Sequence, residues 1–297
     1  TSDFDSRNAR FTDEALVPQF PAKPNKTLIV GLSMIAALLL SISVVLLLDA
    51  FNNTITSIKH CEDKSDKEIL NSTFADIACG SGAFLLEVYQ LLHDILVDYY
   101  IKNDVDKLIQ ISINTHKLPF DIKKQILKNC IFGVDKDFNA VEAAKFGLLL
   151  KLLENEDNSS ITIPALPSLD ENIHFGNSLI SSNATDNANI DAINPFDFVD
   201  TKFDVIVGNP PYMSTEDIKE FTPLEKPIFE EIYQSAYNQY DKYFLFIEQG
   251  INLLKENGYF GYIVPSKFIK VTSGKKLRKF ISNNNLLDSL ISFGSNQ

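Results

Sequence analysis

The chain has 297 residues, of which 45% are hydrophobic, and its formal net charge is −12. This length suits one α/β domain with an additional segment, and the acidic balance excludes a surface that binds nucleic acid over its whole extent. The cysteines Cys61, Cys79 and Cys130 are scattered and form no CxxC pair, which excludes a zinc site or disulfide framework and fits a reducing compartment.

The first candidate element is an uncharged segment, LIVGLSMIAALLLSISVVLLL, at residues 28–48. It reaches the ~20 residues that span a bilayer, and a buried helix of this length is rarely apolar on every side. We therefore expect a polar, proline-containing arm at residues 1–27, a transmembrane helix at 28–48 and a charged linker at 49–70. Lys23 and Lys26 precede the span, so the positive-inside rule alone places the amino end in the cytoplasm.

Spaced prolines, Pro18, Pro21 and Pro24, precede this apolar segment, and FNNTI follows it at residues 51–55. Across residues 8–66 the sequence resembles the last membrane helix of Wzz-type polysaccharide chain-length determinants and bacterial tyrosine kinases. The resemblance implies periplasmic prolines and a cytoplasmic exit, which is the opposite orientation. We follow it because the remaining sequence is typical of a cytosolic protein, and we expect a membrane-anchored chain whose following domain is cytoplasmic.

Strand and helix patterns alternate after this segment. Apolar, β-branched runs predict strands at residues 74–78, 130–134, 172–175, 203–208, 259–264 and 287–293. Apolar residues at helical spacing predict helices at 83–101, 119–129, 139–154, 241–256 and 274–283. Polar stretches between them, including the one after residue 212, are expected to be loops. The alternation predicts an α/β fold with a mostly parallel sheet and helices on both faces.

The sequence ADIACGSGAFL, at residues 75–85, combines the end of a strand, a Gly80-Ser81-Gly82 turn and the start of a helix. Glycines let a ligand approach the backbone closely, and a helix amino end offers free N–H groups to a carboxylate or phosphate. A small-residue turn that merely packs helix on strand is an equally good interpretation. The turn is not a P-loop, because no Gly-Lys-Ser/Thr follows.

Polar residues follow the next two expected strands. Asp135 ends one of them, where an acidic residue can accept both hydroxyls of a ribose, although it lies further from the turn than the ~20 residues typical of dinucleotide folds. Asp135 could instead cap the next helix, a role that Asp137 or Asn139 could also fill. Asn177, in GNSL, predicts only a turn when taken alone.

The most informative motif is Asn209-Pro210-Pro211-Tyr212, directly after the apolar strand FDVIVG. Ligands of open α/β sheets bind at such strand ends. The Asn209 side-chain carbonyl and a proline backbone carbonyl are two rigid acceptors for an NH₂ group, and Tyr212 can stack on a flat ring. Gripping both amine hydrogens would free the nitrogen lone pair for attack on an electrophilic methyl. A rigid loop with a surface tyrosine is the plainer alternative.

Taken in order, DIACGSGAFL, GVDKD, GNSL, FDVIVGNPPY and YFLFIEQGINLLKENGYFGYIVPSKFI resemble adenine-specific DNA methyltransferases of restriction–modification systems. Type I modification subunits and fused restriction–methylase enzymes are the most similar, and the resemblance covers residues 68–297. It implies a Rossmann-like fold, S-adenosylmethionine as cofactor, and transfer of its methyl group to the exocyclic amine of a flipped adenine. DNA and a restriction or specificity subunit are the implied partners.

The resemblance also assigns site residues. Its implied cofactor-binding residues are Asp76, Ala78, Cys79, Gly80, Gly82, Asp135 and Asn177. Within this set the turn at 78–82 meets the methionine part, Asp135 the ribose and Asn177 the adenine ring. Its implied catalytic residues are Asn209, Pro210, Pro211 and Tyr212, with Ser266-Lys267-Phe268 beside the flipped base.

The sequence departs from this family at both ends. A TP-containing motif normally precedes the glycine turn, and a final antiparallel strand and a target-recognition domain normally follow. We therefore expect a truncated catalytic core at residues 71–297, in which the basic stretch at 267–279 contacts phosphates or, more simply, forms a solvated helix face.

Other functions share some of these motifs. Release-factor glutamine methyltransferases and RNA methyltransferases also carry Asn-Pro-Pro-Tyr, although the ACGSGAFL turn and the insertion before Asp135 favour DNA. Cys79 is not preceded by proline, which disfavours a cytosine-ring methylase. An inactive, membrane-anchored fragment linked to polysaccharide chain-length control is the alternative from another class.

Overall fold

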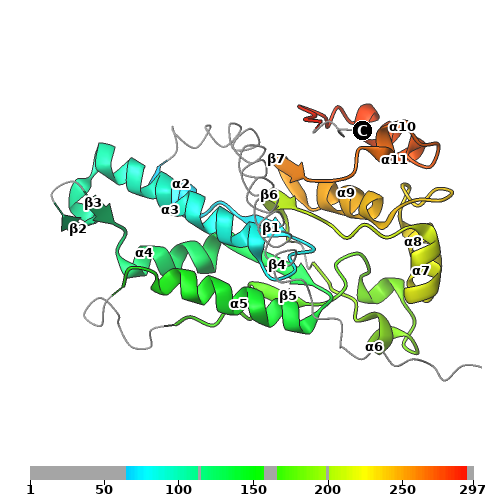
Figure 1. The fold of residues 1–297 in the computed structure, drawn as a ribbon, viewed down its shortest axis with the longest axis horizontal. Coiled ribbons are helices and arrows are strands. Elements are labelled where there is room, and N and C mark those ends of the chain that lie inside the picture. Colours follow the sequence, from blue (N-terminus) through cyan, green and yellow to red (C-terminus); the bar gives the residue numbers. More distant parts are fainter. Residues whose placement is uncertain (1–64, 113–114, 157–165, 199–200, 293–297) are drawn as a thin grey trace, which may run out of the picture. The chain divides into compact units, whose positions relative to one another are not determined.

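The computed structural model describes residues 65–112, 115–156, 166–198 and 201–292 (Figure 1). The chain divides into two units, Thr1–Asn53 and Thr54–Gln297, and all described residues belong to the second. The predicted arm, the predicted span at 28–48 and most of the predicted linker lie outside the described residues. Within the described part of the chain, no helix is long and apolar enough to cross a membrane.

A five-stranded sheet forms the centre of the second unit. Its strands are β1 (Phe74–Asp76), β4 (Ile131–Asp135), β5 (Ile173–Phe175), β6 (Phe203–Gly208) and β7 (Leu254–Tyr262). They follow the order β5-β4-β1-β6-β7, and all four pairings are parallel. The chain order therefore reverses at β1, so the carboxyl ends of β1, β4 and β6 meet at a switch point where ligands bind. The predicted parallel α/β sheet is confirmed.

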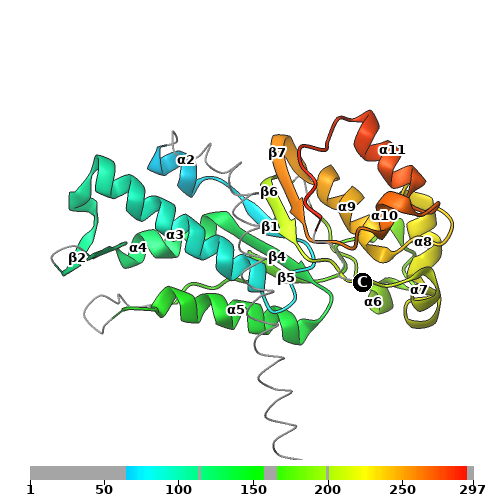
Figure 2. The ribbon, with the colours of Figure 1, turned by 45° about the horizontal axis from the view of Figure 1, so that its top comes forward.

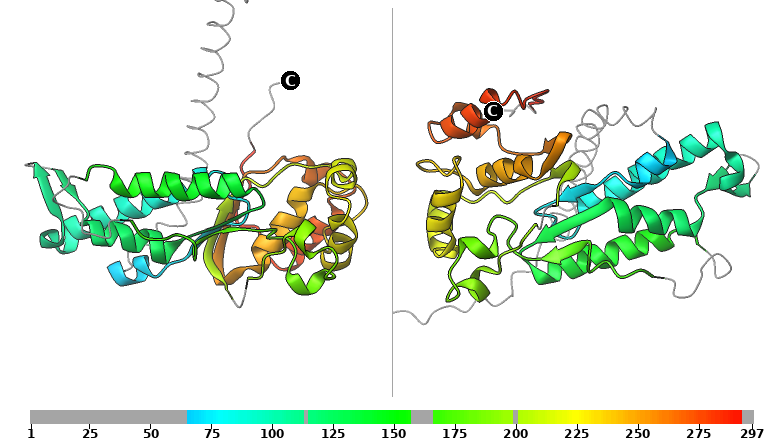
Figure 3. Two further views of the ribbon diagram at one scale, coloured as in Figure 1. Left: turned by 90° about the horizontal axis from the view of Figure 1, so that it is seen from below. Right: turned by 180° about the vertical axis from the view of Figure 1, so that it is seen from behind.

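Long helices cover this sheet. α3 (Ala83–Asn103) and α5 (Phe138–Leu153) contact each other and β4, as Figure 2 shows. α9 (Lys242–Asn252) contacts β7 and also α11 (Lys275–Asn283), and these two helices lie side by side in both views of Figure 3. These four helices match the predicted ones, although α9 ends earlier than expected.

The turn that joins β1 to α3 requires a glycine at position 82. Gly82 is the N-cap of α3 and has φ +83°, a left-handed conformation that side chains disfavour. A Cβ atom added there would lie 2.9 Å from the Ala144 Cβ of α5. Gly82 therefore permits both the turn and the close approach of α3 to α5.

Replacing Gly82 with alanine is expected to lower the free energy of unfolding by about 2–3 kcal/mol. The left-handed conformation costs ~1–2 kcal/mol for a residue with Cβ, and overpacking adds to it. Urea unfolding measures the loss. The double variant Gly82→Ala/Ala144→Gly removes the 2.9 Å contact with the Ala144 Cβ, but the Ala144 Cα remains 3.2 Å away. It also keeps the backbone cost and adds about 0.5–1 kcal/mol for a glycine inside α5, so it should stay less stable than the wild type. A single variant as stable as the wild type would contradict this packing.

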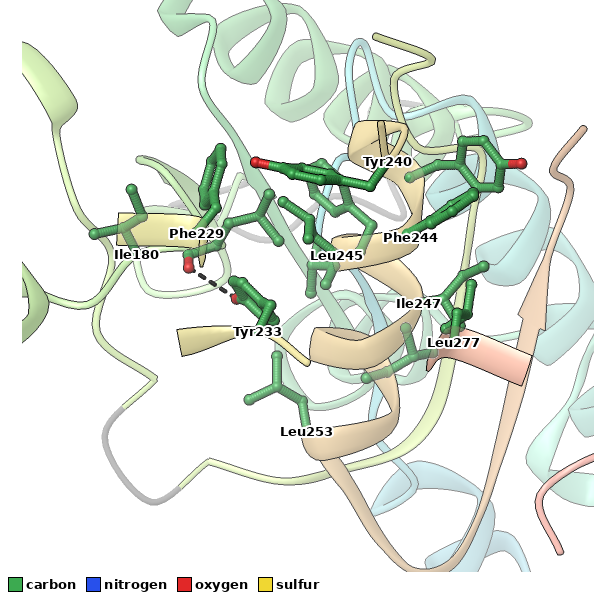
Figure 4. Close-up of a cluster of buried hydrophobic side chains, with 14 of the residues drawn as sticks. Ile180, Phe229, Tyr233, Tyr240, Phe244, Leu245, Ile247, Leu253 and Leu277 are labelled. Atoms are coloured by element: carbon green, nitrogen blue, oxygen red, sulfur yellow. Dashed lines mark hydrogen bonds between the residues drawn. The ribbon is translucent and has the colours of Figure 1, made fainter. Parts of the chain in front are cut away.

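The segment after residue 212 is not the polar loop that the sequence predicts. It forms α7 (Thr215–Phe221) and α8 (Glu225–Ile232), and α7 begins with a capping box between Ser214 and Asp217. Phe229 and Tyr233 join α9 and α11 in one buried cluster (Figure 4), and the Tyr233 hydroxyl donates to Leu179 O at 2.8 Å. Because this segment has many charged residues, its apolar, core-facing positions were not recognised in the sequence.

Two further boundaries were wrong. β7 begins at Leu254 rather than at residue 259, because residues 255–258 bulge from the ladder between the pairs Phe203–Leu254 and Val205–Tyr259. Residues 287–292, predicted to be part of a strand, have no regular structure. Their apolar side chains, Leu287, Leu290 and Ile291, are exposed, so no packing surface selects a strand there.

Several short elements complete the second unit. α2 (Asp66–Leu70), capped by Ser65, lies inside the predicted linker, and an antiparallel hairpin that the sequence did not predict joins β2 (Ile109–Ser112) to β3 (Thr115–Lys117). The predicted helix at 119–129 is confirmed. The remaining elements are η2 (Val105–Lys107), α4 (Phe120–Gln125), the π-helical turn η3 (Ile126–Cys130), η4 (Ser182–Ala184), α6 (Ile190–Ile193) and α10 (Lys267–Lys270).

Candidate active site

The glycine turn is held against the end of the neighbouring strand. Cys79 N donates to Val134 O at 3.0 Å, and Gly80 N donates to the Asp135 Oδ2 at 2.7 Å. The second oxygen, Asp135 Oδ1, accepts from Asp137 N at 2.8 Å. Asp135 is therefore fixed at the turn. It does not cap α5, because the side chain of Asp137 accepts from the first amides of that helix.

Asn177 reaches the same sheet edge from β5. Its neighbour Ser178 donates through Oγ to Ile77 O at 2.6 Å, which ties the GNSL segment to the end of β1. Asn177 is buried, and its Oδ1 accepts from Leu179 N at 3.2 Å. Its Nδ2 is a buried donor with no partner among the described residues. Buried donors are rarely left unpaired, so Nδ2 is available to a ligand acceptor.

Gly208 brings the Asn-Pro-Pro-Tyr loop to the other side of β1. A Cβ atom added at Gly208 would lie 2.6 Å from the Asp76 Oδ1, so glycine is required for the two strand ends to pack. The same Asp76 oxygen accepts from Ala78 N at 3.0 Å. Asn209 therefore begins its loop directly beside the carboxylate that holds the glycine turn. The structure thus gathers the predicted residues of β1, β4, β5 and β6 along one edge of the sheet, where the carboxyl ends of these parallel strands lie.

Tyr212 lies in an aromatic group above this edge. Its side chain is 50% exposed, and its hydroxyl lies within hydrogen-bonding distance of both Asn209 Oδ1 and Ile263 O, the latter at 2.9 Å. The ring packs edge-on against Tyr243 of α9, with centroids 5.8 Å apart, and Tyr243 donates through its hydroxyl to Pro265 O at 3.1 Å. Tyr212 is therefore braced by an aromatic neighbour, while half of its surface remains accessible to a flat ligand.

Sequence reasoning did not identify Tyr243. It lies in the first turn of α9, where the spacing of apolar residues predicted a purely structural role. The signal that could have found it is its place in YDKYF, an aromatic run at a helix start close to the motif it supports.

Asp76 has a raised pKa. Burial raises its pKa to about 7 from 3.8, the nearby charge of Asp135 also raises it, and the hydrogen bond from Ala78 N opposes both. The folded protein therefore retains a proton that the unfolded chain loses near pH 4. Because of this, the contribution of Asp76 to the free energy of unfolding decreases as pH rises from about 4 to about 7.

The Asp76→Asn variant should lack this decrease, which amounts to a few kcal/mol across the window. Urea unfolding of both proteins at several pH values measures it. Asp204→Asn is a control of opposite sign. Burial raises the pKa of Asp204, but hydrogen bonds from Lys255 and Thr73 outweigh burial and lower it, so the contribution of Asp204 to stability is lost as pH falls. Parallel stability profiles for the wild type and Asp76→Asn would contradict the raised pKa.

A buried ion cluster lies next to Asp135 and was also missed. Glu225, 2% exposed at the start of α8, ion-pairs with Lys136 and accepts from the Lys242 Nζ at 3.1 Å. The Lys242 Nζ lies 5.5 Å from the centroid of the Phe229 ring. The single lysine in the apolar sequence of α9 was the available signal, but its partner in the predicted loop was not foreseeable.

A neighbouring cavity and the Cys79 thiol are not assigned to the chemistry of this site. A mostly apolar cavity of about 280 Å³ is lined by Asp76 among others, but not by Asp135, Asn177 or Asn209. The Cys79 thiol is buried and its pKa is raised by burial, so it is not a ready nucleophile. Within the described residues, no cluster of His, Cys, Asp and Glu could hold a metal ion.

A parallel sheet in this order, with a glycine turn after its central strand and a carboxylate after the next, defines a Rossmann-like fold. Residues 129–297 match the family described as Eco57I restriction-modification methylase. The chain belongs to this family.

Known relatives extend the comparison to most of the chain. The type II restriction enzyme and methyltransferase RM.Eco57I of Escherichia coli is 60% identical over 245 residues, which is 82% of this chain and 24% of the relative. The type II methyltransferase M.BstVI of Geobacillus stearothermophilus is 31% identical over 222 residues, 74% of this chain and 33% of the relative. The DNA complex of the type IIL enzyme MmeI aligns with a TM-score of 0.48 and 17% identity, covering 83% of this chain and 32% of that one. The chain thus spans about a quarter to a third of the two curated relatives.

Proposed function

We propose that this chain is the catalytic core of a restriction–modification DNA methyltransferase that transfers a methyl group from S-adenosylmethionine to the exocyclic amine of adenine. The observation that carries the proposal is the convergence of Gly80, Asp135, Asn177 and Asn209 at one sheet edge, in a member of a methylase family. Membership of the family supports the reaction class, and the Asn-Pro-Pro-Tyr loop supports adenine as the target.

The residues at this edge fit S-adenosylmethionine. The unpaired Nδ2 of Asn177 is a donor suited to a ring nitrogen of the cofactor's adenine. Asp135, already fixed by two backbone amides, has remaining lone pairs for the ribose hydroxyls. The turn at 78–82, with Asp76 beneath it, would hold the methionine part. When bound, the cofactor supplies an electrophilic methyl group on a sulfonium.

The Asn-Pro-Pro-Tyr loop supplies the groups that would bind the target adenine and its amine. Asn209 Oδ1 and the Pro210 carbonyl would accept its two hydrogens and so make the nitrogen lone pair available. Tyr212, accessible and braced by Tyr243, would stack on the adenine once the base has left the duplex. The Tyr212 hydroxyl contacts Asn209 Oδ1 in the described structure, so this contact must open as the target amine enters.

Tritium transfer from methyl-labelled S-adenosylmethionine tests the proposal. Duplex DNA, RNA and a release factor are offered in separate reactions, and isothermal titration with the cofactor is run alongside. We expect label in DNA alone. Label in RNA or in the release factor would replace the proposed substrate, and absence of cofactor binding would favour the inactive fragment.

A further inference from the structure

α10 and α11 carry concentrated positive charge in an acidic chain. Six of the 27 basic residues lie between Glu256 and Asp288, and no Asp or Glu lies between those two positions. Five of the six are exposed lysines, which we call the basic surface: Lys267, Lys270, Lys275, Lys276 and Lys279. An ordinary solvated helix face would mix both signs of charge, so this segregation calls for an anionic partner.

The basic surface begins beside the candidate target site. The Lys267 Nζ lies 3.2 Å from the Asp241 Oδ2, at the start of α9. Two residues later, Tyr243 contacts the rings of both Tyr212 and Phe268, with centroids 5.8 and 6.5 Å away. A polymer bound along α10 and α11 would therefore pass next to the ring proposed to stack on the target base.

The lysines are presented on a fixed support. The sixth cation, Arg278, donates to the carbonyls of Phe268 and Val271 at 2.6 and 2.9 Å, which fastens α11 to α10. Leu277 is fully buried in the cluster that α11 shares with α9 (Figure 4). Arg278 is thus structural, and it holds the two helices that carry the exposed lysines together.

A groove runs along the same helix. Its volume is about 450 Å³, and it is lined by Gln234, Lys276, Lys279, Phe280, Asn283 and Asn284. The lining contains ammonium and carboxamide donors and no carboxylate. Phosphodiester oxygens are anionic and only accept hydrogen bonds, so they complement this lining.

We infer that the basic surface and its groove bind the sugar–phosphate backbone of DNA next to the target base. The inference rests on the proposed function and adds the surface that positions the duplex. Such contacts fix register and orientation without reading sequence. They also explain how a chain of net charge −12 can hold a polyanion through one local region.

The test compares two triple variants of equal charge. Lys270→Gln/Lys275→Gln/Lys279→Gln alters the basic surface, and Lys67→Gln/Lys102→Gln/Lys128→Gln removes three exposed lysines from α2, α3 and η3. Anisotropy of a fluorescein-labelled duplex is measured in about 50–200 mM salt. For the first variant we expect the negative slope of log K against log salt to become shallower by about 2–3. Each lost phosphate contact reduces the magnitude of this slope by ~0.9. The second variant should keep the wild-type slope.

Cofactor titration separates this inference from the proposed function. Both variants should bind S-adenosylmethionine as the wild type does, which verifies folding. The inference would be overturned if all three proteins had equal slopes, or if both variants lost the same amount of slope. It would also be overturned if the wild type did not bind DNA. A wild type that methylates DNA with no slope change in the first variant would overturn only the inference. A wild type that shows the expected slopes but transfers no methyl would overturn only the proposed function.

Discussion

Replacement of Asn209 with alanine is expected to reduce methyl transfer to DNA by about 100- to 1,000-fold, the range seen when one preorganised polar group at a reaction centre is removed. In the proposed reaction, Asn209 Oδ1 accepts one hydrogen of the target amine. Binding of S-adenosylmethionine should be unchanged, because the turn at 78–82 and Asp135 are held by contacts that do not involve Asn209. Single-turnover transfer and isothermal titration measure the two quantities separately.

Tyr212→Phe is the matched control for this loop. It removes the hydroxyl that contacts Asn209 Oδ1 and Ile263 O but keeps the ring. Because the hydroxyl contact must open when the amine binds, transfer should change by only a few-fold. Tyr212→Ala, which removes the ring, should weaken transfer strongly, since base stacking is worth about 1–3 kcal/mol. Retained transfer in Asn209→Ala would refute the assigned role of the amide.

Replacement of Glu225 with leucine is expected to lower the free energy of unfolding by about 3–5 kcal/mol, the cost of leaving buried charge without its partner. Glu225 is 2% exposed and Lys242 is 5% exposed. Burial lowers the pKa of Lys242, and the charge of Glu225 raises it. Without Glu225 the Lys242 ammonium loses its main compensation, and α8 loses its connection to Lys136, next to Asp135.

The double variant Glu225→Leu/Lys242→Leu should recover most of that stability. Replacing a buried ion pair with apolar side chains of similar volume is often neutral or stabilising. Glu230→Ala, which breaks the more exposed pair with Lys226, is the matched control and should cost no more than about 1 kcal/mol. Urea unfolding of the four proteins is the measurement. A loss for Glu225→Leu as small as that for Glu230→Ala would show that the buried cluster does not stabilise α8.

Motifs at strand ends could be predicted because their chemistry is local. A buried apolar run predicts a strand, and a glycine, Asp135 or Asn209 directly after the run marks the carboxyl end of that strand. Parallel pairing then brings these strand ends together. The predicted strand at 203–208 matches β6 for this reason. The bulge at 255–258 was missed because it depends on how β7 meets β6, and no local pattern records that contact.

Tertiary contacts decided what the sequence could not indicate. The segment at 214–232 folds into α7 and α8 because Phe229 is buried against α9 and because Glu225 meets two lysines distant in sequence. Tyr243 supports Tyr212 although α7 and α8 separate the two residues in the sequence, and no local pattern predicts this contact. Such supporting residues can be identified only when the packing between helices is known.

Mass spectrometry of nucleosides tests the central claim most directly. Duplex DNA is incubated with the chain and methyl-deuterated S-adenosylmethionine, then digested, and the position of the label is identified. We predict N6-methyladenine carrying deuterium with the wild type and about 100- to 1,000-fold less of it with Asn209→Ala. Label on a cytosine carbon, or no labelled base although the cofactor binds, would contradict a site in which Asn209 presents an adenine amine to the methyl group.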